Sequence, residues 1–163
     1  MIHRMSHLPE ILLILFILNL GTAFGAGLYE SQIVIPQWFS KSSGSGYSIN
    51  LEAMQKLDSG RQFWVFVTTL PLTLLTLANL VVAWQSLQPE RNWWLAAGLI
   101  TLIERISTFS FFIPTLIKLQ LTDQQLSPAG SRLVALWIGS NYVRNGLTLI
   151  AWLLTLKAFS LAE

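Results

Sequence analysis

Four ionisable side chains lie inside long apolar runs of this sequence. Glu30 lies near the end of the first run, Glu104 and Arg105 lie in the third, and Arg144 lies in the fourth. Charges are costly in hydrocarbon, so such residues usually face the interior of a helical bundle and have a partner. A buried glutamate can act as a general base, and an arginine can hold an anionic or carbonyl-bearing ligand. These four residues are therefore the first candidates for a chemical site.

The composition indicates that a bilayer accommodates the apolar runs. Of the 163 residues, 53% are hydrophobic and only 11% are charged, whereas about a quarter of a soluble domain is charged. Each of four runs exceeds the roughly 20 residues that cross the hydrocarbon layer. We predict an all-α fold, a four-helix transmembrane bundle with a long loop between helices 1 and 2. It forms one integral membrane domain, residues 1–163, with spans at about 9–36, 62–85, 93–119 and 131–159.

The residue types exclude several kinds of chemistry. The chain has no cysteine, and its two histidines, His3 and His7, lie near the N-terminus. Thiol redox chemistry, iron–sulfur clusters and intramembrane haem or copper sites are therefore not expected. No basic run or phosphate-binding glycine loop indicates nucleic acid. We expect no metal and no cofactor. The expected partners are the lipid bilayer and a hydrophobic small molecule. Whether the chain forms a homo-oligomer stays open.

Helical spacing places most of the polar candidates on inward faces. Trp137, Asn141, Arg144 and Asn145 share one face of the fourth predicted span, and Arg105 shares a face with Phe112 in the third. Arg61 opens the second span. The candidate catalytic residues are Glu30 and Glu104. The candidate ligand-binding residues are Arg61, Arg105, Phe112, Trp137, Asn141, Arg144 and Asn145.

A purely structural interpretation of the same residues stays open. Buried ions must be paired whatever they do, so the charges can be interhelical salt bridges that fix the bundle. Gly21 and Gly25 form a GxxxG pattern, which permits close helix packing. Three tryptophans, Trp84, Trp93 and Trp94, are predicted to anchor the membrane interface. Trp38 and Trp64 are expected in the same aromatic belt, with a lid over a cavity as the alternative.

The loop between the first two spans and three prolines complete the expected architecture. The stretch KSSGSGYS is predicted to be flexible, and NLEAMQKLDSGR is predicted to form a short amphipathic helix. Pro71 and Pro114 are expected to kink their helices, and Pro36 ends the first span. We predict a multi-pass protein of the plasma or inner membrane, if the source is bacterial. Four spans place both termini on one side. Counting lysines and arginines puts that side outside, but Arg61 and Arg132 can belong to buried clusters, so the orientation stays open.

Three segments resemble a known family. They are GAGLYESQIVIPQW in the first span, RISTFSFFIPT in the third and WIGSNYVRNGLTLIAWLLTLKA in the fourth. Together they resemble the anthrone oxygenase-like family of small four-helix membrane proteins, most of which have no known function. The resemblance implies a cofactor-independent oxygenase that converts anthrones into anthraquinones. Glu30 or Glu104 would be its base, and Arg105, Arg144 and Asn141 would be donors to the enolate. Trp137 and Phe112 would then sandwich a polycyclic substrate.

Three functions compete at this point. The preferred one is an integral membrane protein that binds a hydrophobic, aromatic small molecule in an intramembrane polar pocket, with a metal-free oxygenase as its enzymatic form. The alternative is a structural or accessory subunit whose buried charges only pair helices. A transporter is disfavoured, because Asn19 and Asn79 are too few polar residues to line a path in the terminal half.

Overall fold

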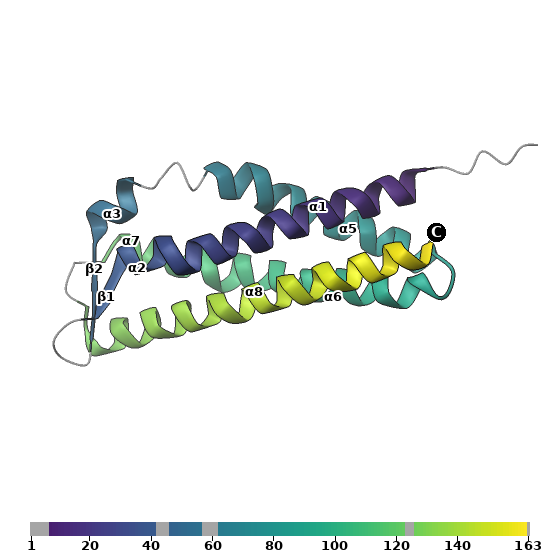
Figure 1. Cartoon of the computed structure of the whole chain (residues 1–163). Coiled ribbons are helices and arrows are strands. Elements are labelled where there is room, and N and C mark those ends of the chain that lie inside the picture. Colours follow the sequence, from purple (N-terminus) through teal and green to yellow (C-terminus); the bar gives the residue numbers. More distant parts are fainter. Residues whose placement is uncertain (1–6, 42–45, 57–61, 123–125, 163) are drawn as a thin grey trace, which may run out of the picture.

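The computed structural model describes residues 7–41, 46–56, 62–122 and 126–162. Four helical rods dominate it (Figure 1). Each is long and apolar enough to cross a membrane, and their bounds are Leu8–Trp38, Trp64–Gln85, Glu90–Gln120 and Pro128–Ala162. The expected all-α class is therefore confirmed, and the four helices support a multi-pass membrane protein. The start of the first rod and the end of the last lie at the same end of the molecule (Figure 1).

Three of the four rods contain a short π-helical segment. The first consists of α1 (Leu8–Tyr29), η1 (Glu30–Val34) and α2 (Ile35–Trp38). The second consists of η2 (Trp64–Thr69) and α5 (Leu70–Gln85), and the third of α6 (Glu90–Ser107), η3 (Thr108–Phe112) and α7 (Ile113–Gln120). The fourth is the continuous helix α8 (Pro128–Ala162).

Each π segment ends just before a proline. Pro36, Pro71 and Pro114 each stand in the first turn of the α-helix that follows η1, η2 and η3. A proline inside a helix has no N–H to donate, and its ring clashes with the carbonyl four residues before it. A wider turn accommodates one extra residue and relieves this conflict. The expected disturbances at Pro71 and Pro114 thus take the form of π turns, and Pro36 has one as well.

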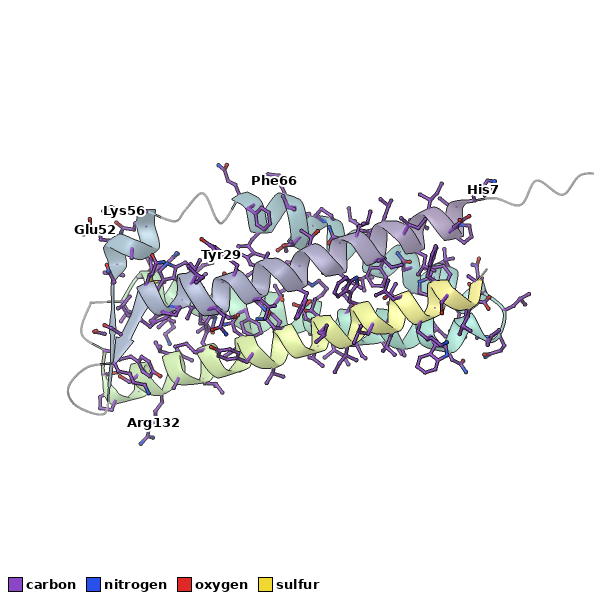
Figure 2. The ribbon with its side chains drawn as sticks, in the orientation of Figure 1. His7, Tyr29, Glu52, Lys56, Phe66 and Arg132 are labelled. Carbon is purple, nitrogen blue, oxygen red and sulfur yellow. The ribbon has the colours of Figure 1, made fainter. Side chains whose placement is uncertain are left out.

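The rods pack around buried residues of moderate size. Helix α8 contacts α6 and α1, and α5 contacts α6 and α1, so each rod has two neighbours. One apolar cluster at mid-height includes Phe16, Leu20, Leu72 and Ala151. Large apolar side chains such as Phe66 project outward from the bundle, as Figure 2 shows. Outward apolar residues are expected where lipid replaces water around a helix bundle.

The segment between the first two rods folds over one end of the bundle. Strands β1 (Phe39–Lys41) and β2 (Tyr47–Ile49) pair antiparallel, and helix α3 (Leu51–Lys56) follows. The backbone N–H of Tyr47 donates to Ser131 Oγ of α8 at 3.1 Å. We call β1, β2 and α3 the cap. The short helix was expected, but the flanks of the predicted flexible stretch form a hairpin; its residues 42–45 lie outside the described part.

Two expectations about tryptophans are wrong. Trp94, predicted to be an interface anchor, is 3% exposed, and its indole N–H donates to Asn79 Oδ1 at 2.9 Å. Its neighbour Trp93 is 41% exposed, as an anchor would be. Trp38, expected in the aromatic belt, is buried among apolar residues of the cap and of the bundle end beneath it. In both cases periodicity within one helix could not show which neighbouring segment covers the ring.

Candidate functional site

Arg144 of α8 contacts a residue from each of the three π segments. Its Nη2 donates to Glu30 Oε2 of η1 at 3.1 Å. Its guanidinium carbon lies 4.6 Å from the ring centre of Phe112 in η3 and 5.8 Å from that of Trp64 in η2. Both distances are within the range of cation–π attraction. Thus the continuous helix supplies the cation, and the three π segments supply the groups around it.

The pair formed by Arg144 and Glu30 is only partly enclosed. The Arg144 side chain is 14% exposed and the Glu30 side chain is 12% exposed. A guanidinium has five N–H donors, and one hydrogen bond, to Glu30, is present among the described residues. Trp64 also lies against the Glu30 carboxylate. The guanidinium therefore has donors that no described residue uses, and a small part of both side chains stays exposed.

The second ion pair is closed. Arg105 donates to both oxygens of the neighbouring Glu104, from Nε at 2.5 Å and from Nη2 at 2.6 Å. Thr108 adds a third donor, its hydroxyl, at 3.2 Å. The two charged side chains are 9% and 3% exposed. Glu104, although a predicted catalytic candidate, is thus occupied on both oxygens, whereas Nη1 of Arg105 has no hydrogen-bond partner among the described residues.

Asn145 joins α8 to the first rod. Its Nδ2 donates to the carbonyl of Gly27 at 3.0 Å and to Ser31 Oγ at 2.9 Å. A Cβ added to Gly27 would lie 2.2 Å from Asn145 Oδ1, so any other residue there would force the Asn145 side chain to move. Within the predicted GxxxG pair, Gly21 packs against Trp152 but Gly25 has no neighbour within 4 Å of an added Cβ. The closest approach is therefore at Gly27, outside that pattern.

Trp137 and Asn141 form part of the bundle core. The indole N–H of Trp137 donates to the carbonyl of Phe112 at 3.2 Å, and its ring packs edge-on against Phe112 and against Phe39 of the cap. Asn141 Nδ2 donates to the Trp137 carbonyl at 2.9 Å, whereas Asn141 Oδ1 has no partner among the described residues. Trp137 thus links Phe39 of the cap to Phe112, whose ring lies against the Arg144 guanidinium.

The structure brings three of the predicted site residues together and separates others. Glu30 and Phe112 both contact the guanidinium of Arg144. Glu104 and Arg105 bind each other, and Arg61 lies outside the described residues. Trp64, expected in the aromatic belt with a lid over a cavity as the alternative, is partly exposed and also lies 5.8 Å from the Arg144 guanidinium. Trp64 precedes Pro71 by about two turns, just as Glu30 precedes Pro36. This similar spacing before a proline is the sequence feature that could have assigned Trp64 to the site.

Among the described residues are two grooves on the outer surface of the bundle. The larger, of about 520 Å³, runs between α1 and α5 and is lined mainly by leucines together with Asn19, Thr22 and Pro71. The smaller, of about 400 Å³, lies between α5 and α6 beside Trp84. Neither is lined by a member of the two ion pairs. Within the described residues no three histidine, cysteine, aspartate or glutamate side chains are grouped as metal ligands.

Comparisons with known proteins give no relative. No family model matches the chain, and no curated protein and no solved structure shows significant similarity to it.

Proposed function

We propose that this protein binds a hydrophobic, aromatic small molecule inside the membrane, at the side of Arg144 that Glu30 leaves open. The observation that carries the proposal is the convergence of all three π segments on one arginine. π turns are rare and occur frequently at functional sites, because the extra residue disturbs an otherwise regular helix. The three prolines account for each turn locally; what supports a site is that the three turns contribute side chains around the same arginine.

The surroundings of Arg144 favour a planar ligand with an acidic or carbonyl oxygen. Phe112 and Trp64 offer aromatic faces, and the guanidinium offers planar, permanently charged donors. Aromatic side chains bind flat apolar molecules by stacking or edge contacts. A polar group of the ligand would reach the guanidinium where the two side chains stay 14% and 12% exposed.

An oxygenase without metal is the enzymatic form of this proposal, and it rests on the family resemblance. Glu30 would take a proton from an anthrone methylene carbon, and Arg144 would stabilise the negative charge that moves onto the carbonyl oxygen. The carbanion would give its electrons to O₂, which adds at that carbon; the resulting peroxide anion would take the proton back from Glu30, and the hydroperoxide would lose one water, with the remaining hydrogen of that carbon, to leave the quinone. Glu104 is the weaker candidate for the base, since Arg105 and Thr108 occupy its oxygens.

Native mass spectrometry of the protein in mild detergent, with an absorption spectrum of the same sample, tests the proposal. We expect a stoichiometric aromatic or quinone-like molecule in the wild type and in Lys157→Gln, which removes an exposed charge from the far end of the same helix. The molecule should be absent from Arg144→Ala. Oxygen uptake with an added anthrone then tests the enzymatic form, and Glu30→Gln should abolish it.

A structural or accessory subunit is the second candidate. Two observations favour it: each membrane-embedded charge described here pairs with another, and neither surface groove reaches the ion pairs. This candidate predicts a ligand-free mass for the wild type, and loss of stability as the main effect of Arg144→Ala.

A further inference from the structure

The charged residues at the two ends of the bundle differ in number and sign. At the capped end the described residues include four exposed cations, Lys41, Lys56, Lys118 and Arg132. Glu52 is the one acid among them, and it pairs with Lys56 at 2.6 Å. At the opposite end the described residues include two cations, Arg91 and Lys157, and two acids, Glu10 and Glu90. Among the described residues, the capped end is therefore the more positive of the two.

The four cations of the capped end come from four different elements. Lys41 ends β1, Lys56 ends α3, Lys118 lies in the last turn of α7, and Arg132 lies in the second turn of α8. Figure 2 shows Lys56 on the cap and Arg132 pointing away from α8. Arg132, which could have belonged to a buried cluster, is thus a surface cation. It counts toward membrane orientation, as does Lys118 at the end of the neighbouring rod.

We propose that the capped end faces the cytoplasm, and that its four cations bind the anionic lipid headgroups of the cytoplasmic leaflet. Short cytoplasmic loops carry an excess of lysine and arginine, and acidic residues contribute little to this rule. Anionic lipids attract cations close to the surface, each contributing about a five-fold gain in affinity. Lys118 and Arg132 flank two membrane spans, which places them at headgroup depth. The proposal is independent of any ligand at Arg144.

Orientation can be measured by single-cysteine labelling, because the chain has no cysteine of its own. Gln55→Cys places a thiol on the exposed face of α3, and Ser160→Cys places one on the exposed face of the last turns of α8. In intact cells a membrane-impermeant maleimide should label Ser160→Cys but not Gln55→Cys. Gln55→Cys should react only after the membrane is permeabilised. The reverse pattern would overturn the proposal.

Lipid binding needs its own measurement. Native mass spectrometry should detect more bound phosphatidylglycerol than phosphatidylcholine when the purified protein is titrated with each. The double variant Lys118→Gln/Arg132→Gln should lower phosphatidylglycerol affinity more than ten-fold, at about five-fold per cation. The matched double variant Arg91→Gln/Lys157→Gln removes two cations from the other end and should change it less than two-fold. Equal losses in both double variants, or no loss in either, would also overturn the proposal.

Discussion

Replacing Gly27 with alanine tests the packing between α1 and α8. The new Cβ would lie 2.2 Å from Oδ1 of Asn145, which must then move. Moving it breaks the hydrogen bonds to the Gly27 carbonyl and to Ser31. Hydrogen bonds between membrane helices average about 0.6 kcal/mol each, and overpacking a tight contact costs about 1 to 3 kcal/mol. We therefore expect Gly27→Ala to lower the free energy of unfolding by about 2 to 4 kcal/mol.

The control for this variant is Gly25→Ala, on the same helix. An added Cβ at Gly25 has no neighbour within 4 Å, so the substitution should be neutral or slightly stabilising. The assay is equilibrium unfolding by sodium dodecyl sulfate in mixed micelles, followed by far-ultraviolet circular dichroism. Equal stability of the two variants would refute the reasoning. In addition, Gly27→Ala should cost almost nothing on an Asn145→Ala background, because the colliding atom is then absent.

Two further substitutions address the other polar contacts. Glu104→Gln should lower the free energy of unfolding by about 3 kcal/mol, because it leaves Arg105 as a buried charge without its partner. The same detergent titration measures this loss. A loss below about 1 kcal/mol would mean that the pair is hydrated. Trp94→Phe removes the hydrogen bond to Asn79 and should destabilise the bundle by about 1 kcal/mol. Trp93→Phe, on a ring that is 41% exposed, should be neutral, and an equal loss in both variants would contradict the contact.

The architecture could be predicted from the sequence because each of its signals is local. A run of apolar residues longer than the bilayer needs no knowledge of its neighbours, and the four rods agree with the expected spans to within a few residues. The prolines likewise indicate irregular turns at Pro71 and Pro114 by their own chemistry. Helical periodicity also indicates that Asn145 and Arg144 face inward.

The partners of these residues could not be predicted, because partners depend on how the helices are rotated and offset against one another. Arg105 binds its own neighbour Glu104, whereas Arg144 reaches Glu30 across 114 residues of chain. Nothing in either local sequence distinguishes the two cases. The hairpin was missed for a related reason. Its strands have three residues each, and packing against α8 and the bundle end stabilises them, since a lone short hairpin is marginal in water.

The location of the π segments could be predicted from the sequence, but their contact with one arginine could not. Each proline predicts a disturbed turn in its own helix, but the sequence does not show that the three turns meet. In the folded chain η1, η2 and η3 each contribute one side chain to the surroundings of Arg144. This convergence distinguishes Arg144 from Arg105, although both are arginines within apolar helices.

Exchanging the two charges of the Glu30–Arg144 pair tests most directly the claim that Arg144 binds a ligand. The double variant Glu30→Arg/Arg144→Glu keeps an ion pair between α8 and η1 but moves the guanidinium away from its position between Phe112 and Trp64. If the pair serves a ligand, this variant should unfold close to the wild-type detergent concentration, yet lose the small molecule in native mass spectrometry. A wild type that carries no such molecule, or a charge-exchanged variant that keeps it, would contradict the claim that Arg144 is a ligand site.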